Sequence, residues 1–166
     1  MKTILSEKLP RILKNKKRLE EILKIKISNR GKEVTIEGEA KDEFRAQKVI
    51  DAINFGFPFS TAILIKTEDF EFEILNIKEH TNRKDLSSVR ARIIGKGGKT
   101  LKTLTDLSDC FFELKDNFVG IIGAPQLMKN AQESVTSIIR GSKQGNVYKF
   151  LEKRRFQEPV DLGLKE

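Results

Sequence analysis

The sequence predicts an α+β protein made of two units that share one order of elements: strand, helix, helix, strand, strand, helix. Alternating apolar residues mark short strands, and apolar residues with helical spacing mark the segments between them. Landmarks also recur in the two halves. An offset of 81 residues separates Ile12-Leu13 from Ile93-Ile94. An offset of 85 residues separates Ile36 to Gly38 from Ile121 to Gly123. We interpret the near-constant offset as an internal duplication, with coincidence among common αβ patterns as the alternative.

The first unit is expected over residues 1–66. Its first elements are a strand within 1–6, a helix over 8–14 with Pro10 in its first turn, a basic break at Asn15-Lys16-Lys17 and a helix through Leu19 to Leu23. A strand at Ile25 and Ile27, a turn over 29–32 and a strand with Val34 and Ile36 follow. The helical spacing of Phe44, Val49, Ile50 and Ile53 predicts a longer helix over about 41–55.

The second unit is expected over residues 67–166. Its elements are a strand in which Phe70, Phe72 and Ile74 alternate with Glu71 and Glu73, a helix over 87–94 with Ser87 as N-cap, the loop Gly95-Lys96-Gly97-Gly98, a helix through Leu101, Leu104 and Leu107, a hairpin of 110–114 and 118–122, a long helix from Pro125 to Gly141, and a last helix over 146–155 with Asn146 as cap.

An aromatic segment, 55–60, joins the units where a flexible linker would be polar and rich in Gly or Ser. We expect Phe55, Phe57 and Phe59 to pack the units against each other as one body. The alternative is that these rings only complete the first core.

Composition favours a polyanionic partner. Net charge is +8 and the pI is about 9.6, which suits nucleic acid or an anionic membrane surface. The membrane interpretation is weak because the longest uncharged stretch, 52–65, contains Pro58 and is too short to span a bilayer. No apolar secretory signal is visible. A single cysteine, Cys110, excludes an intramolecular disulfide and is compatible with a reducing cytoplasm.

Positive charge is concentrated in two segments. The segment 83–102 has seven basic residues against Asp85, and 140–155 has six against Glu152. Concentrated charge of this kind indicates a binding face.

Three glycines stand in the loop between the two short helices of the second unit. Gly95, Gly97 and Gly98 remove Cβ atoms, so that a sugar-phosphate backbone can approach the main chain closely. The next helix adds free N–H groups, and Lys96 and Lys99 add charge. A GxxG loop between two helices is the device with which KH domains clamp a four-nucleotide single strand.

Two other interpretations of the loop compete with this one. A P-loop would need a glycine where Ile93 stands and a preceding strand, so the nucleotide-triphosphatase interpretation fails. A glycine-rich helix connection without a ligand is the remaining alternative. The corresponding loop of the first unit, 14–17, has no glycine. It indicates a degenerate unit with a structural or protein-binding role.

Three stretches together resemble the archaeal branch of the "partner of Nob" KH proteins of small-ribosomal-subunit maturation. They are Arg92 to Thr100, Val119 to Gly123 and Gly145 to Arg155. The resemblance implies two tandem type I KH units, rigidly packed, the first lacking GxxG, with a C-terminal basic helix. One departure is Gln144-Gly145-Asn146, where the family often has His.

The resemblance further implies binding near the 3′ end of small-subunit (16S) ribosomal RNA, beside the endonuclease that trims it. It makes Lys143, Lys149, Arg154 and Arg155 candidates for a second RNA contact, with a solvated basic helix end as the alternative. The predicted RNA-binding residues are Arg90, Arg92, Ile94, Gly95, Lys96, Gly97, Gly98, Lys99, Lys102, Lys143, Lys149, Arg154 and Arg155.

No catalytic, metal or cofactor constellation is evident, so we expect a non-catalytic protein without cofactors. His80 has no Cys or His partner and is expected at the surface. Cys110 is expected in the core, and Glu71 and Glu73 on the solvent face of an edge strand.

The leading hypothesis is a cytoplasmic assembly factor that grips RNA phosphates with the loop, over an apolar floor of Ile94 and Leu104. The runner-up is a protein adaptor for a nuclease or a translation initiation factor subunit, with incidental binding of RNA or single-stranded DNA.

Overall fold

The computed structural model describes residues 1–156, so the last ten residues of the expected second unit lie outside the described part. The first half has the predicted order of elements: β1 (Lys2–Leu5), α1 (Leu9–Lys14), α2 (Lys16–Leu23), β2 (Lys26–Arg30), β3 (Glu33–Glu37) and α3 (Ala40–Phe55). Two short helices, α4 (Phe59–Ala62) and α5 (Leu64–Thr67), lead to the second half.

The second half repeats this order and adds one helix. Its elements are β4 (Glu71–Asn76), η1 (Ile77–His80), α6 (Leu86–Ile94), η2 (Lys96–Gly98), α7 (Lys99–Ser108), β5 (Phe111–Lys115), β6 (Phe118–Gly123), α8 (Pro125–Ile139) and α9 (Gln144–Phe156). Each half contains one antiparallel three-stranded sheet. The strand order is β1-β3-β2 in the first (sheet A) and β4-β6-β5 in the second (sheet B). The fold is therefore mixed α and β, as predicted.

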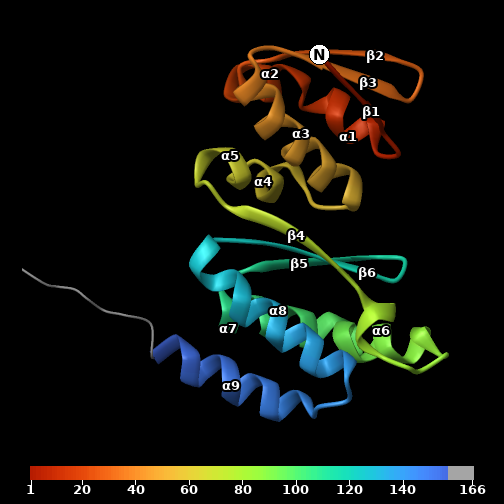
Figure 1. Ribbon diagram of the computed structural model, residues 1–166, viewed down its shortest axis with the longest axis vertical. Coiled ribbons are helices and arrows are strands. Elements are labelled where there is room, and N and C mark those ends of the chain that lie inside the picture. Colours follow the sequence, from red (N-terminus) through yellow and green to blue (C-terminus); the bar gives the residue numbers. More distant parts are fainter. Residues whose placement is uncertain (157–166) are drawn as a thin grey trace, which may run out of the picture.

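The two halves are stacked, each with its sheet on one side of its helices (Figure 1). Sheet B lies between the helices of the first half and α6, α7 and α8 of the second. Its central strand, β6, is accordingly buried from Val119 to Gly123. Sheet B thus has two apolar faces, whereas β3 of sheet A alternates buried Val34 and Ile36 with more exposed neighbours.

Aromatic rings fill the junction of the halves. Of the three predicted rings, Phe55 and Phe57 lie there, whereas Phe59 packs against the core of the first half, under Arg18. Phe55 and Phe57 stack with ring centroids 6.1 Å apart. Both meet Phe72 of β4 edge-on, at 6.0 and 5.8 Å. Strand β6 approaches closely because Gly120 has no side chain: a Cβ there would lie 2.7 Å from the Phe55 ring. Ile122 of sheet B belongs to the core of the first half.

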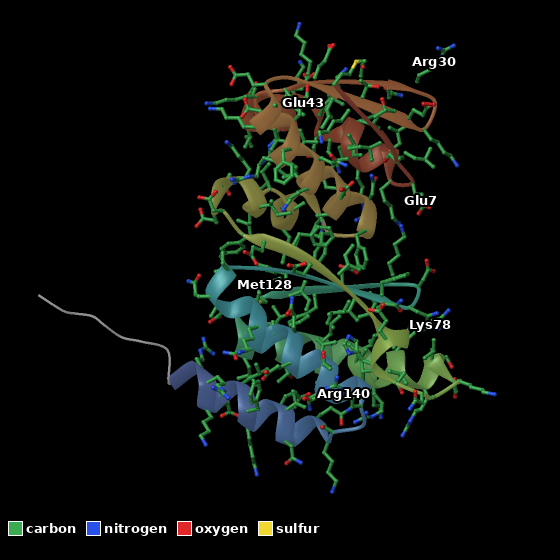
Figure 2. The ribbon with its side chains drawn as sticks, in the orientation of Figure 1. Glu7, Arg30, Glu43, Lys78, Met128 and Arg140 are labelled. Atoms are coloured by element: carbon green, nitrogen blue, oxygen red, sulfur yellow. The ribbon has the colours of Figure 1, made fainter. Side chains whose placement is uncertain are left out.

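An ion pair also joins the halves. Glu7, which follows β1, lies on the side of the first half that faces sheet B (Figure 2). Its carboxylate is 2.9 Å from the ammonium of Lys115 on β5.

Three local predictions are wrong. The N-cap of α6 is Asp85 rather than Ser87, because the Asp85 carboxylate accepts hydrogen bonds from the Ser88 N–H and from the Ser87 hydroxyl. Helix α9 begins at Gln144, so Asn146 lies inside it. Phe44 is 56% exposed, because it lies on the opposite side of α3 from buried Ile53, and the Lys48 ammonium lies over its ring at 4.9 Å.

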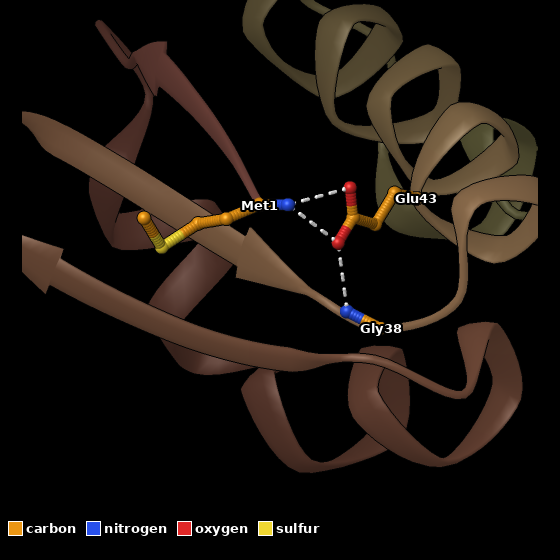
Figure 3. A network of polar contacts seen from close by, with 3 residues as sticks. All are labelled: Met1, Gly38 and Glu43. Atoms are coloured by element: carbon orange, nitrogen blue, oxygen red, sulfur yellow. Dashed lines mark hydrogen bonds and ion pairs between the residues drawn. The ribbon is translucent and has the colours of Figure 1, made fainter.

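A buried carboxylate fastens the start of the chain to α3. The Met1 amino group donates to both oxygens of Glu43, at 2.9 and 2.8 Å (Figure 3). The Gly38 N–H donates to Oε2 of the same group at 3.0 Å. Within residues 1–156, no helix combines the length and apolar composition that a bilayer crossing needs.

Candidate nucleic-acid interface

The loop between α6 and α7 has a backbone conformation that favours glycine. The φ angles of Gly95, Gly97 and Gly98 are 77°, 61° and 78°. A hydrogen bond of 3.1 Å from the Gly98 N–H to the Gly95 carbonyl closes the loop around a 3-10 turn. Side chains rarely adopt such φ values, so the three glycines determine the shape of the loop.

These glycines differ in their surroundings. A Cβ on Gly95 would lie 2.6 Å from the backbone nitrogen of Thr100 and would overlap the Thr100 side chain. Gly95 therefore packs against the first turn of α7. A Cβ on Gly97 or Gly98 would meet no atom within 4 Å. The main chain at these two residues faces open space, where a sugar-phosphate backbone can approach it.

One lysine lies in the loop and two lie in the first turns of α7. Lys96, Lys99 and Lys102 are not buried, and none of them belongs to a salt bridge formed within residues 1–156. No side chain caps the N-terminus of α7. The first N–H groups of the helix and the positive end of its dipole therefore act on the same region as the lysines. This arrangement suits a phosphate.

The two predicted arginines of α6 make internal hydrogen bonds. Arg90 donates to the Asn117 side chain in the β5–β6 turn at 2.5 Å. Arg92 donates to the Ile138 carbonyl in the last turn of α8 at 2.6 Å and to the Ser142 carbonyl in the segment that follows this helix. Their contact with RNA stays a prediction. The geometry favours a positioning role, because both guanidinium groups fasten α6 to neighbouring elements.

The predicted apolar floor divides into one exposed and one buried residue. Ile94 is 38% exposed directly before the loop, so a base can pack on it. Leu104 is fully buried in the core of the second half and cannot touch a ligand, so its assignment is wrong. The helical spacing of Leu104 with Leu101 and Leu107 marks it as a residue of the core and not as a residue that contacts a ligand.

Helix α9 is anchored on α7 and α8 by buried Val147 and Leu151. Arg155 donates to the Asp106 carbonyl at 3.1 Å and lies 3.5 Å from the Asp109 carboxylate, at the C-terminal end of α7. Arg154 lies 5.3 Å from the centre of the Phe150 ring. Both arginines are therefore at the end of α7 that is remote from the glycine loop.

Lys143 and Lys149 are exposed and lie outside every salt bridge of the described residues. The start of α9 is close to the end of α6, because the Gln144 side chain donates to the Arg92 carbonyl at 3.4 Å. Lys143 directly precedes Gln144 and is thus next in the chain to this contact with α6. The RNA contacts of Lys143 and Lys149 stay predictions.

Sequence reasoning missed the groups that hold the loop and its helices in place. Thr100 fits against Gly95, Asn117 holds Arg90, and the Ser142 carbonyl receives Arg92. A β-hairpin turn at 115–117 marked Asn117 as a turn residue. Nothing in the sequence pairs it with α6.

The titratable groups outside the loop are poor candidates for chemistry. Cys110 is fully buried, and burial raises the pKa of its thiol to about 11. His80 is partly buried and not simply a surface residue, and its Nδ1 is enclosed without a hydrogen-bond partner among residues 1–156. Glu71 and Glu73 are exposed on β4, an edge strand of sheet B, as predicted. Within the described part of the chain, no three His, Cys, Asp or Glu side chains are grouped to hold a metal ion.

Comparisons with known proteins agree with this architecture. Residues 71–156 match the model of the eukaryotic type KH domain, KH-domain type I, in its Pno1 form. A KH domain-containing protein of Methanocaldococcus jannaschii is 27% identical over 128 residues, which are 74% of this chain and 56% of that protein. The pre-rRNA-processing protein pno1 of Emericella nidulans is 31% identical over 79% of this chain and 54% of its own length.

Two solved structures share the fold over nearly the whole chain. Dim2p from Pyrococcus horikoshii has a TM-score of 0.83 and 26% identity, covering 92% of this chain and 98% of that one. A chain of the a/eIF2alpha–aDim2p–rRNA complex from the same organism also has a TM-score of 0.83 and 26% identity, covering 95% and 94%. The chain spans about half the length of the curated relatives it matches. It belongs to the family of eukaryotic-type (type I) KH-domain proteins, and its second half is a KH domain of the Pno1 type.

Proposed function

We propose that this protein is a non-catalytic RNA-binding assembly factor. It holds the single-stranded 3′-end region of small-subunit (16S) ribosomal RNA in the cytoplasm while the subunit matures. The observation that carries the proposal is the open main chain of Gly97 and Gly98, flanked by the charges of Lys96, Lys99 and Lys102. The relatives support it, since several are named for pre-rRNA processing and one is named in a complex with rRNA.

Phosphates bind at the loop through backbone N–H groups, lysine charge and the α7 dipole. A base packs on the exposed side chain of Ile94. Arg90 and Arg92 hold α6, and so the loop, in the geometry that the strand requires. Lys143 and Lys149 add phosphate contacts, whereas Arg154 and Arg155 mainly anchor α9.

The domain division that we propose is a degenerate KH unit over residues 1–66, which lacks GxxG, and a KH domain over 67–166. The two are type I units that move as one body. Three aromatic rings, the close approach at Gly120 and the pair between Glu7 and Lys115 support the rigid junction.

An adaptor role is the second candidate function. The Pyrococcus complex is named for a/eIF2alpha as well as rRNA, which supports a translation initiation factor subunit as a partner here. The trimming endonuclease is the other proposed partner. A notch of about 330 Å³ beside the junction presents Ile74 and Phe118, which are 50% and 40% exposed, and such a patch suits a protein partner.

Fluorescence anisotropy with a single-stranded oligonucleotide from the 3′ end of 16S rRNA tests the proposal. A scrambled RNA, a DNA of the same sequence, and the double variant Lys96→Asp/Gly97→Asp run beside it. Tight binding that depends on both the sequence and the loop supports the maturation role. Retained affinity in the folded double variant overturns the assignment of the loop. Equal binding of matched and scrambled RNA leaves a generic RNA binder, and absence of binding favours the adaptor.

A further inference from the structure

Strand β4 is an edge strand of sheet B with one unpaired side. The strand order is β4-β6-β5, and within residues 1–156 no strand pairs with the outer side of β4. An edge strand can pair with a further chain, and natural proteins prevent this at many edges with proline or lysine. The six residues of β4, Glu71–Asn76, include neither.

The register of the β4–β6 ladder shows which main-chain groups face outward. The Ile77 N–H donates to the Asn117 carbonyl at 2.9 Å, at the end of this ladder. Hydrogen-bonded and non-hydrogen-bonded pairs alternate along an antiparallel ladder, so the main chain of Leu75, two residues earlier, also faces β6. The N–H and C=O groups of Phe72 and Ile74 therefore point away from β6, to the outer edge.

The residue before β4 agrees with this alternation. Phe70 lies on the outward side, and its N–H donates to the Leu64 carbonyl of α5 at 3.3 Å. Helix α5 thus closes the edge at its start. Beyond that point the edge is open, since Ile74 is 50% exposed.

A hollow lies on each face of the sheet beside this edge, because consecutive residues of a strand point to opposite faces. Ile74 lines the notch of about 330 Å³ between the halves, together with Phe118. Leu75 lines a hollow of about 380 Å³ against α8, whose other walls are polar and charged side chains, Lys129 and Glu133 among them. A strand added to β4 would direct alternate side chains toward these two hollows. In such complexes main-chain hydrogen bonds give affinity, and pockets for alternate side chains give specificity.

The outer edge of β4 is acidic in a protein that is basic as a whole. Glu68, Glu71 and Glu73 are exposed and lie outside every salt bridge of residues 1–156. Only Asp69 is neutralised, by Arg45 at 2.6 Å. A segment that pairs with this edge is therefore favoured if it carries positive charge.

Three other occupants are disfavoured by this charge. The phosphates of RNA would be repelled by the carboxylates, although the protein has a net charge of +8. Two β4 strands paired with each other would bring their glutamates together. The chain's own residues 157–166 have three acidic side chains against one lysine.

We propose that the outer edge of β4 binds an extended segment of a partner protein in which basic and apolar residues alternate. The segment adds a fourth strand to sheet B, with its basic side chains on the face of Glu71 and Glu73 and its apolar side chains on the face of Ile74. This inference goes beyond RNA binding and gives the adaptor role a site and a class of partner. Helix α7, which follows the glycine loop, contacts the opposite edge strand, β5, so RNA and the segment can bind together.

Labelled peptides of about nine residues, in which lysine and valine alternate, test the proposal by fluorescence anisotropy. One form is N-methylated on its valines and another on its lysines. Only alternate N–H groups of a strand face a given neighbour, so one methylated form should lose binding and the other should keep it. In hydrogen exchange, the amides of Phe72 and Ile74 should become protected only when the unmodified peptide is bound.

Two matched variants test the charge. Glu71→Gln/Glu73→Gln removes two carboxylates from the edge, and Glu33→Gln/Glu37→Gln removes two exposed carboxylates from β3 of sheet A. The first should weaken peptide binding about fivefold at low salt, because exposed ion pairs contribute about 0.2–1 kcal/mol each, and the second should not. RNA affinity should stay unchanged in both, and thermal unfolding checks each fold.

Equal binding of the two methylated peptides would show a contact through charge alone and overturn the proposal. Absence of peptide binding, or equal losses in the two charge variants, does the same. Protection of Phe72 and Ile74 in a dimer of the free protein, detected by sedimentation, would assign the edge to a second copy instead. If Lys96→Asp/Gly97→Asp keeps its RNA affinity while the peptide results hold, the proposed function fails and this site stands.

Discussion

Replacing Gly95 with alanine is expected to destabilise the fold far more than replacing Gly98, although both belong to one loop. Gly95 has φ 77° and ψ 171°, a region nearly restricted to glycine, and strain there costs about 1–3 kcal/mol. The new Cβ would also lie 2.6 Å from the backbone nitrogen of buried Thr100, which cannot rotate away. Overpacking of this kind adds about 1–3 kcal/mol, so the expected loss is about 4 kcal/mol.

Gly98 is different because space is open around it. Its φ of 78° and ψ of 10° are left-handed helical, and alanine there costs about 1–2 kcal/mol. The methyl group would instead stand where a phosphate approaches the main chain. We therefore expect Gly98→Ala to weaken RNA binding about tenfold, which corresponds to ~1.4 kcal/mol.

Gly31→Ala is the matched control. Gly31 also has a left-handed φ, 59°, and a methyl group there would meet no atom within 4 Å, but the residue lies in the β2–β3 turn. Urea unfolding gives the stabilities and anisotropy the affinities. If Gly95→Ala costs no more stability than Gly98→Ala, the overlap with Thr100 is not a constraint. If Gly98→Ala and Gly31→Ala affect RNA binding equally, the open main chain at Gly98 is not the phosphate site.

Three further predictions test other residues. Leu104→Ala should lower the free energy of unfolding in urea by about 2–5 kcal/mol, because it leaves a cavity in the core. Ile94→Ala should leave this free energy nearly unchanged and weaken RNA binding. The reverse pattern would show that Leu104, and not Ile94, contacts the RNA. The hydrogen bond from the Met1 amino group, followed by that from Gly38, holds the pKa of Glu43 below its usual 4.5. This carboxylate therefore stabilises the fold above its unfolded-state pKa, and the contribution is lost as pH falls through the lower folded pKa. Glu43→Gln should flatten the acid side of the stability curve, and an unchanged acid limb would contradict the assignment. Since burial raises the thiol pKa of Cys110 to about 11, Ellman's reagent at pH 8 should label it only after denaturation; rapid labelling of the native protein would refute its enclosure.

The order of elements could be predicted from sequence because each one has a local signature. Alternation marked β4, glycines marked the loop, and Pro125 marked the start of α8. Phe44 shows where such signatures fail. At 100° per residue it lies about 140° and 120° around α3 from Val49 and Ile50, so it is on the side of the helix away from the core. Apolar residues identified the helix, but the angular position of each residue around its axis decides which of them face the core.

The roles of the basic residues were harder to predict, because charge alone does not distinguish a ligand contact from an internal anchor. Lys96 and Lys99 form no salt bridge within residues 1–156, whereas Arg92 is bound to carbonyls at the end of α8, about 50 residues away in sequence. Backbone carbonyls have no signature in sequence, so no pattern indicates such a pair. The planar guanidinium, with its several donors, suits carbonyl clusters at helix ends better than an ammonium does.

That difference between arginine and lysine holds in both halves. Arg11 and Arg18 contact Gly56 and Phe59, as Arg90 and Arg92 contact their neighbours, and in each half the arginines fasten the helix pair to the rest of the fold. The lysines of both helix junctions stay at the surface. The halves thus keep one arrangement of anchors and available charges and differ in the glycines. The second half can bring phosphate to its main chain at Gly97 and Gly98, whereas the junction of the first half, residues 14–17, has no glycine and presents only side chains.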